Sequence, residues 1–288
     1  MSDNTRMSSE NERRSLQRPR VDKARTGQKV ESMQGYELTG KTPVMRTAAP
    51  RFGNGNGNGT AISQRAARVQ QFPLFLNISP ADCREIVSAA QEKEFLRRQT
   101  MFFQGDPARQ ILLLAAGCVK ITQLGQNGTE VILRLIGPGE LVGTTGLFLR
   151  CNHGSTARTL QASAALVWDA AVFEALAERF PVLRDNAARI LGLHFQQLEE
   201  RFREISTERV ARRLGLEIAR LLNQVGQRVN GAVKISLSRE ELAQLTGTTL
   251  FTVCRLLSQW EQKGIVTTGR ETVMVKDPQA LEELWESE

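Results

Sequence analysis

The sequence predicts an α+β fold: an N-terminal β-roll of the jelly-roll type, a long dimerisation helix and a C-terminal winged helix-turn-helix. Short β-rich runs between residues 100 and 170 alternate with Gly and Pro turns, as in a small antiparallel barrel. The hydrophobic period then becomes helical, and the last part combines two short helices with a hairpin. We therefore divide the chain into a disordered basic tail (1–68), a β-roll domain (69–170), a dimerisation helix region (171–206) and a winged helix-turn-helix domain (207–288).

The composition is that of an ordinary soluble protein of about two domains. The chain has 288 residues, of which 41% are hydrophobic and 24% are charged. Its longest uncharged apolar run, Ile111–Ala116, is far shorter than the ~18–20 residues that cross a bilayer, and no signal-peptide pattern follows Met1. The four cysteines are too dispersed for a disulfide framework or a zinc ribbon: Cys83, Cys118, Cys151 and Cys254. We expect a cytoplasmic protein with no membrane segment.

The net charge of +7 belongs to the tail. Residues 1–68 contain 13 Lys and Arg against 6 Asp and Glu, so the rest of the chain has no net charge. The tail is rich in Ser, Arg, Gln, Asn and Gly and has few bulky apolar residues, which predicts disorder. The basic isoelectric point therefore does not indicate that the globular part binds nucleic acid, and that inference has to come from sequence patterns.

The elements of the β-roll follow from turn signals and short apolar runs. A short helix is expected over Pro80–Ala90, before the first strand. Glycines near residues 105, 117, 125–128 and 137–139 separate the expected strands. These strands are Phe102–Phe103, Ile111–Ala115, Val119–Ile121, Val131–Ile136, Leu160–Ser163 and Ala165–Asp169.

A heptad pattern marks the long helix. One position of the heptad is occupied by Leu191, Leu198 and Ile205, and the companion position by Ala188, Phe195 and Phe202. Such a seam predicts a helix that pairs with a second helix, and we expect a homodimer. The alternative is a core helix that packs on its own barrel.

The C-terminal part predicts a helix-turn-helix with a wing. After a strand at Val233–Leu237, Ser238 and Glu241 form a capping box that opens the first helix, and Gly247 permits the turn. Thr248 or Thr249 caps the second helix. The second helix buries the stripe Val253, Leu256, Leu257 and Trp260. A hairpin of Ile265–Thr268 and Thr272–Val275 and a last helix capped at Asp277-Pro278 complete the domain.

The exposed face of the second helix predicts DNA binding. When its apolar stripe points inward, Leu250, Phe251, Cys254 and Arg255 face outward. Arg255 can donate two hydrogen bonds to guanine, and the apolar side chains suit thymine methyl groups. We expect Thr248, Thr249 and Thr252 to contact phosphates at the helix N-terminus. The alternative is a helical hairpin that serves protein contacts.

Five stretches of the chain resemble the CRP/FNR transcription factors. They are Phe103–Ala108, Gly117–Ile121, Pro138–Gly143, Gly146–Phe148 and the helix-turn-helix. The resemblance covers about residues 70–288 and implies an effector-binding, cyclic-nucleotide-binding-like β-roll, a dimer helix and a DNA-reading head. It places the effector pocket around Gly143, Thr144, Thr145, Thr156, Ala157, Arg158 and His194.

The departures from that family argue against cyclic AMP. In cyclic-AMP sensors a Glu follows the glycine that matches Gly143, whereas Thr144 and Thr145 stand here. The Arg that grips the cyclic phosphate is replaced by Ser155, and Arg158 substitutes for it only in a different loop register. A buried phosphodiester without its cation is poorly compensated. Many family members also carry a base-reading Glu where Phe251 stands, so the DNA site should differ from the usual half-site.

The resemblance of the second helix is greatest to nitric-oxide-responsive regulators, which implies haem sensing. Of the two histidines, His194 is the better candidate ligand, since it lies beside the heptad seam; it is also interpretable as a flanking polar residue. No cysteine precedes Cys83, which excludes the iron–sulfur chemistry of the oxygen-sensing branch. Cys151-Asn152-His153 supplies too few ligands for a metal site, and a surface loop is the alternative. Cys118 is expected in the core. Oxidation of Cys254 is a hypothesis, because exposure alone does not activate a thiol.

These inferences together predict a homodimeric, sequence-specific transcription regulator controlled by an effector in the β-roll. Two-fold symmetry requires a near-palindromic operator with half-sites about one helical turn apart. We expect RNA polymerase as a further partner. The alternative is a redox or small-molecule sensor whose helix-turn-helix makes protein contacts only. The sequence contains no catalytic triad, phosphate loop or metal-binding run, so no catalytic residues are assigned and an enzyme is not expected.

Overall fold

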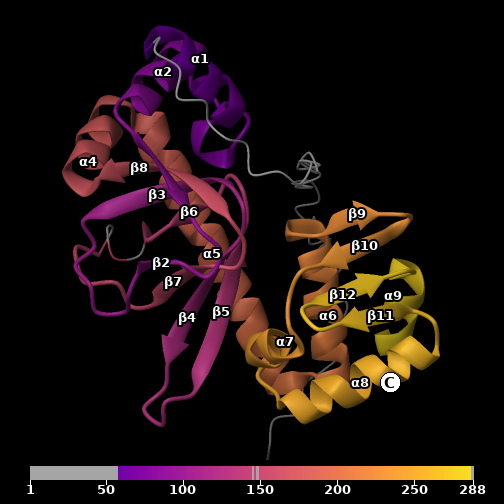
Figure 1. Cartoon of the computed structure of the whole chain (residues 1–288). Helices are drawn as coiled ribbons and strands as arrows, with labels where there is room; N and C mark the ends of the chain where they lie inside the picture. Colours follow the sequence, from indigo (N-terminus) through magenta and orange to yellow (C-terminus); the bar gives the residue numbers. More distant parts are fainter. Residues whose placement is uncertain (1–57, 145, 147–148, 287–288) are drawn as a thin grey trace, which may run out of the picture. The chain divides into compact units, whose positions relative to one another are not determined.

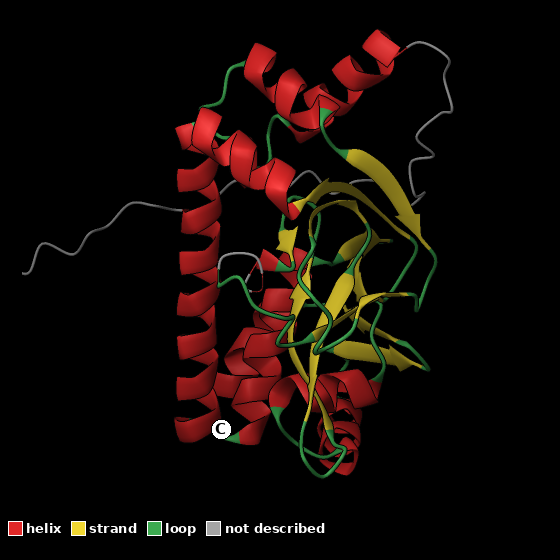
Figure 2. Ribbon diagram, turned by 90° about the vertical axis from the view of Figure 1, so that its left-hand side faces the viewer, coloured by secondary structure: helices red, strands yellow, loops and turns green. Residues whose placement is uncertain are grey.

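The computed structural model describes residues 58–144, 146 and 149–286. The expected tail up to residue 57, together with Thr145, lies outside the described residues. Figures 1 and 2 show a β-roll region, a long helix (α5, Pro181–Thr207) and a C-terminal region of helices and short strands. The predicted α+β class is confirmed. In the part of the chain that the structure describes, no helix is long and apolar enough to span a bilayer.

The β-roll consists of two four-stranded antiparallel sheets. The strand order in the first sheet is β1-β8-β3-β6, and in the second it is β2-β7-β4-β5. The first comprises β1 (Gln91–Phe95), β8 (Ser163–Asp169), β3 (Gln110–Ala116) and β6 (Leu141–Val142). The second comprises β2 (Thr100–Phe102), β7 (Thr156–Thr159), β4 (Val119–Leu124) and β5 (Glu130–Ile136).

The roll is held together by an apolar interior that draws on both sheets. Because successive side chains of a strand point to opposite faces, each strand gives alternate residues to this interior. The buried cluster contains residues of seven strands: Phe95, Leu112, Leu114, Val119, Ile121, Ile136, Val142, Ala157, Ala165 and Val167. Turn glycines connect the strands, and several have positive φ angles, among them Gly117 (φ 102°) and Gly139 (φ 89°).

Several helices accompany the roll, and one of them corrects the expected boundary of the tail. Residues 58–68, which the sequence had placed in the disordered tail, belong to helix α1 (Asn58–Val69). Its Ala66 and Val69 are buried in a cluster with α2 (Pro80–Ser88) and the first sheet. Further along the chain, α4 (Ala170–Arg179) and α5 add Phe173 and Leu183 to that cluster.

The strand prediction was wrong at one place in the roll and missed two strands. The strand expected at Leu160–Ser163 lies four residues earlier, as β7, and Leu160 already follows it. Thr159 is fully buried and donates its hydroxyl to the carbonyl of Leu96, which fixes this register. The strands β1 and β6 were not expected, since the first is mostly charged and the second is two residues long.

The C-terminal region begins with α6 (Val210–Gln224) and ends with α9 (Pro278–Glu286). Between them lie α7 (Arg239–Thr246) and α8 (Leu250–Gln262), the two helices of the predicted helix-turn-helix. A four-stranded antiparallel sheet in the order β11-β12-β10-β9 supports them. Its strands are β9 (Gln227–Val229), β10 (Ala232–Ile235), β11 (Val266–Gly269) and β12 (Thr272–Val275).

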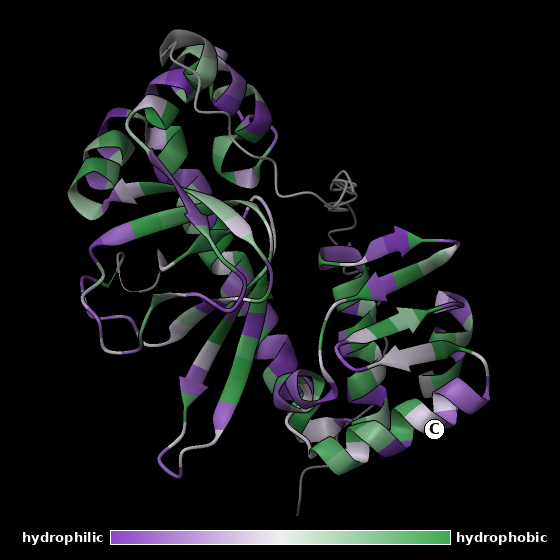
Figure 3. Cartoon of the chain, viewed as in Figure 1, coloured by the Kyte–Doolittle hydropathy of each residue, from purple (hydrophilic) through white to green (hydrophobic). Residues whose placement is uncertain are grey.

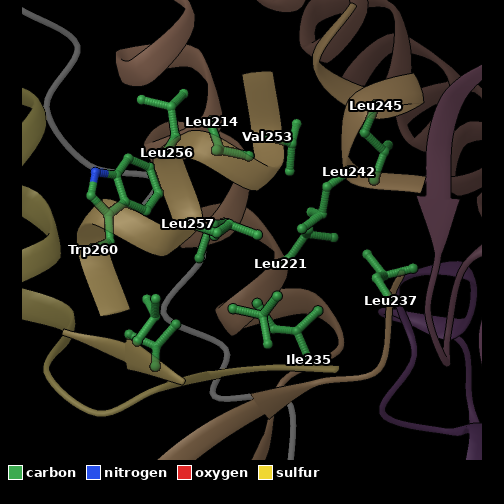
Figure 4. Close-up of a cluster of buried hydrophobic side chains, with 14 of the residues drawn as sticks. Leu214, Leu221, Ile235, Leu237, Leu242, Leu245, Val253, Leu256, Leu257 and Trp260 are labelled. Carbon is green, nitrogen blue, oxygen red and sulfur yellow. The ribbon is translucent and has the colours of Figure 1, made fainter. Parts of the chain in front are cut away.

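One hydrophobic core joins the helix-turn-helix to the outer face of the second sheet (Figure 4). The labelled side chains of α6, α7, α8 and β10 converge in this core. Cys118, Ile132 and Leu135 from the β-roll belong to the same cluster. Apolar burial stabilises by roughly 25 cal/mol per Å². This shared cluster therefore attaches the helix-turn-helix to the roll by packing, in addition to the covalent connection through α5 and α6.

We predict that Gly117→Ala destabilises the β-roll. A β-carbon at Gly117 would lie 2.1 Å from Ser163 Oγ, and the φ angle of 102° disfavours any L side chain. Together these effects should lower the free energy of unfolding by about 1–3 kcal/mol. Thermal and urea unfolding followed by circular dichroism measure the change. Gly154→Ala is the matched control, since a β-carbon there meets no atom within 4 Å; equal stability of both variants would contradict the prediction.

Candidate functional site

The turn between α7 and α8 has the geometry that the sequence predicts. Ser238 Oγ accepts the N–H of Glu241 at 3.1 Å, and the Glu241 carboxylate accepts the N–H of Ser238 at 2.9 Å. This capping box satisfies free N–H groups of the first turn. At the other end Gly247 has φ 60° and ψ 43°, a left-handed conformation that favours glycine. Thr249, not Thr248, caps α8, because its hydroxyl accepts the N–H of Thr252.

Helix α8 buries one stripe and exposes the start of the opposite face. The stripe of Val253, Leu256, Leu257 and Trp260 is buried, as predicted (Figure 4). Leu250, Phe251 and Arg255 are exposed, with 78% of Phe251 accessible, and Figure 3 shows hydrophobic residues at this N-terminal end of α8. Exposing a Leu and a Phe side by side has a cost in water that contact with a partner removes.

Local hydrogen bonds already engage the three threonines at the start of α8. Thr249 Oγ1 and Thr252 Oγ1 lie 2.9 Å apart and already bond to each other. The N–H of Thr248 donates to the carbonyl of Ala243, which ties the turn back to α7. The first N–H groups of α8 point out of its N-terminus, where a helix dipole favours an anion. The backbone of this turn is therefore better placed for a phosphate than the Thr249 hydroxyl.

In the expected effector region, two aromatic rings occupy the space beside Gly143. The His153 ring stacks on Phe102, with ring centroids 3.6 Å apart and an interplanar angle of 10°. A β-carbon at Gly143 would lie 3.2 Å from His153 Cε1, and one at Gly146 would lie 3.3 Å from Nδ1. Both glycines thus leave room for this ring. Burial lowers the pKa of His153, against the opposing charge of Asp106, and sequence reasoning had assigned the residue to a surface loop.

The other expected pocket residues do not all come together. Thr144 is buried, and its hydroxyl has no hydrogen-bond partner in the described part of the chain. Ala157 points into the roll interior, whereas its neighbour Arg158 lies on the opposite face of β7 and donates from Nε to Thr100 Oγ1. Thr156 Oγ1 accepts the N–H of Gln104, on the rim of the roll. In this register Arg158 is not available to a phosphate inside the roll.

His194 lies on α5 beside Glu140, which follows the turn after β5, and has charged neighbours. Its Nε2 is 3.9 Å from Glu140 Oε1, and its Nδ1 is buried without a hydrogen-bond partner among the described residues. Burial, together with the positive charge of Arg134, lowers the pKa of His194 to about 3. The imidazole is thus neutral at pH 7, and its contact with Glu140 is not an ion pair. A haem face requires apolar lining, so these neighbours do not fit a haem ligand.

The four cysteines are free thiols, and they are not gathered in a metal cluster of the described residues. Cys151 is exposed while His153 is buried, so the two side chains of this loop do not converge. Among the described residues, no cluster of three or more His, Cys, Asp and Glu side chains could hold a metal ion. Cys118 is buried in the core as expected, and burial with the charges of Glu140 and Glu241 raises its pKa. Cys254 is half-buried on α8.

Sequence reasoning missed a buried network of charged side chains at the base of α5. Arg201 and Glu204 of α5 meet Glu217 and Arg220 of α6, with both glutamates only 4% exposed. Arg220 donates to both oxygens of Glu204, at 2.7 and 2.6 Å. The pairing depends on how two helices cross and has no periodic signature in the sequence.

Two family models match the two parts of the chain. The Cyclic nucleotide-binding domain matches residues 92–180, and the Crp-like helix-turn-helix domain matches residues 208–284. The first match includes both sheets of the roll from β1 onward. The second includes α6, the helix-turn-helix of α7 and α8, and the wing formed by β11 and β12.

Named relatives and solved structures agree with these matches. The chain is 28% identical over 212 residues to the Cyclic AMP receptor protein of Thermus thermophilus, covering 74% of this chain and 96% of the relative. It is 23% identical to the Anaerobic regulatory protein of Pasteurella multocida, covering 78% and 84%. The structure of the c-di-GMP-responsive global regulator CLP of Xanthomonas campestris aligns with a TM-score of 0.62 at 19% identity, covering 69% and 100%.

We predict that His194→Gln makes the protein less sensitive to acid. The folded-state pKa of His194 is about 3, below the value of about 6.5 in an unfolded chain. The unfolded state therefore binds more protons, and stability falls as the pH falls below about 6.5. Relative to the variant, the wild type should lose up to about 2 kcal/mol between pH 7.5 and 5. Urea unfolding of wild type and variant at several pH values measures this difference. Burial raises the pKa of Glu140, which gives the opposite dependence of stability on pH. Because both proteins contain Glu140, the comparison subtracts that contribution.

An NMR titration of the His194 ring gives an independent check. A pKa near 6.5 in the folded protein would contradict the prediction. His153→Gln is the control that separates the two histidines of the chain.

Proposed function

Because the chain belongs to the CRP/FNR family of transcription regulators, we propose that it binds a near-palindromic DNA operator as a homodimer. An effector that acts on the β-roll would control this binding through α5. The proposal assigns base reading to the exposed start of α8 and phosphate contact to the turn before it. RNA polymerase is the partner expected of such a regulator at a promoter.

The exposed side chains at the N-terminus of α8 are the observation that carries DNA binding. A recognition helix meets base edges with its first residues, and here Leu250, Phe251 and Arg255 are presented by a helix whose other face is locked in the core. Arg255 lies one turn after Phe251, so a guanine contact and an apolar contact to thymine can be made together. A head used only for protein contacts is the second candidate, since an exposed Phe also suits a protein groove.

The exposed seam of α5 supports a dimer. Phe195, Leu198, Phe202 and Ile205 are 49–72% accessible although they are large and apolar. They follow the heptad spacing that pairs helices in a left-handed seam. A second copy of α5 is the partner with the matching spacing, and two-fold pairing would place two α8 helices for successive major grooves, about 34 Å apart.

The effector is proposed to be something other than a cyclic nucleotide held by its phosphate. Ser155 stands where cyclic-AMP sensors have an Arg, and Arg158 faces away from the interior. The stacked His153 and Phe102 rings and the free Thr144 hydroxyl favour an uncharged ligand or a rearrangement of the loop itself. Haem on His194 is not part of the proposal, because Glu140 and Arg134 surround that residue.

Arg255→Ala should relax the preference for one guanine in each half-site. Loss of a two-bond contact to guanine costs about 1–3 kcal/mol of discrimination at that position. A selection from random duplexes, followed by sequencing, compares the variant with wild type. Lys263→Ala is the control, since it removes a positive charge from the other end of α8. An unchanged preference in Arg255→Ala would remove this residue from base reading, and failure of wild type to enrich any duplex would favour protein contacts instead.

Phe202→Glu should dissociate the dimer and weaken operator binding. A buried aromatic at a helix–helix interface commonly contributes 2 kcal/mol or more, so the dimer dissociation constant should rise at least about tenfold. Sedimentation equilibrium measures the assembly, and fluorescence anisotropy measures binding to a selected operator. Gln197→Glu, which adds the same charge at an exposed position outside the seam, should behave as wild type. A dimer of Phe202→Glu as tight as wild type would contradict the seam.

A further inference from the structure

The guanidinium of Arg201 contacts three elements at once. From α5, its Nη1 donates to the carbonyl of Leu133 in β5 at 2.6 Å. Its Nη2 donates to the carbonyl of Leu245 in α7 at 2.9 Å and lies 3.3 Å from Glu217 Oε2 in α6. The side chain is only 15% exposed. One planar group therefore connects α5 to β5 of the roll, to α6 and to α7, the first helix of the helix-turn-helix.

The carbonyl of Leu245, in the last turn of α7, is one that depends on a donor from outside the helix. The last carbonyls of a helix have no partner within the helix and carry partial negative charge, which a cation stabilises. A second arginine serves the same end of α7: Arg213 Nη2 lies 3.4 Å from the carbonyl of Gly247, while its Nη1 donates to Ile205 at the end of α5. Two guanidinium groups thus hold the end of α7 against α5.

The end of α7 determines where α8 begins. Gly247 is the left-handed cap of α7, and only Thr248 and the cap residue Thr249 separate it from Leu250. The N–H of Thr248 donates to the carbonyl of Ala243, which holds this turn against α7. A displacement of the α7 terminus relative to α5 therefore displaces the N-terminus of α8, which carries Phe251 and Arg255.

We propose that Arg201 is a positioning residue for operator binding, which ties the end of α7 to α5 and β5 and so fixes the direction of α8. The inference rests on the proposed DNA-binding function. The fork matters because its two terminal nitrogens donate to different carbonyls. A lysine keeps the charge beside Glu217 but has a single nitrogen and does not reproduce a planar fork.

The direct test measures the geometry of the head without DNA. Spin labels are placed by Gly192→Cys on α5 and Ser258→Cys on α8, both exposed, in a background with Cys151→Ser and Cys254→Ser. Labelled full-length chains are diluted in excess unlabelled protein, and pulsed dipolar EPR gives the distance distribution within a chain. Wild type should give a narrow distribution, and Arg201→Met a broadened or shifted one. Arg203→Met is the control, since Arg203 on the same helix forms exposed ion pairs with Glu200 and Glu208.

Operator affinity and the lysine variant complete the test. Arg201→Met should bind a selected operator at least about tenfold more weakly, the loss expected for one charged hydrogen bond, with Arg203→Met as wild type. Arg201→Lys should resemble Arg201→Met in both measurements, and it replaces that variant if Arg201→Met does not fold. Full rescue by lysine, or an unchanged distance and affinity in Arg201→Met, would overturn the inference. If wild type binds no DNA, the proposed function fails, while the EPR distances still decide the role of Arg201.

Discussion

Burial of one stripe of α8 is the constraint that fixes the orientation of this helix in the helix-turn-helix. Trp260, Leu257 and Val253 are almost fully buried, and they pack against α6, α7 and the small sheet. Rotating α8 by a quarter turn would expose this stripe at a cost of several kcal/mol. The helix therefore has one stable orientation, and in it Phe251 and Arg255 face outward. The exposed apolar residues follow from the core, because the helix cannot bury both faces.

A similar constraint applies to α5, whose exposed apolar residues alternate along the sequence with residues that form ion pairs with α6. Leu198, Phe202 and Ile205 are exposed and apolar, whereas the half-buried Arg201 and the buried Glu204 form ion pairs with α6. Because residues three and four apart share a helix face, rolling α5 to improve one face strains the other. Pairing of two long helices and placement of the head are thus coupled by the geometry of one helix.

Features that depend on neighbours in sequence were predictable, and features that depend on crossing segments were not. The capping box, the glycine turn and the buried stripe of α8 follow from local spacing, and all agree with the structure. Residues 58–68 of helix α1 were assigned to the tail because they are mostly polar; Ala66 and Val69 are buried in a cluster with α2 and the first sheet. Likewise β1 has one buried residue, Phe95, and pairs with β8 about 70 residues away, which no local pattern reveals.

Glu140 connects the β-roll to α5 and α6 through contacts that the local sequence does not predict. Glu140, directly after the turn that closes β5, accepts the N–H of Gly137 and lies next to His194 of α5 and Gln224 of α6. Two residues of β6 separate it from Gly143. The short strand β6, which pairs with β3, therefore connects Gly143 directly to Glu140. The contacts of Glu140 in turn connect this part of the roll to α5 and α6, whose Arg201 and Arg213 contact the end of α7.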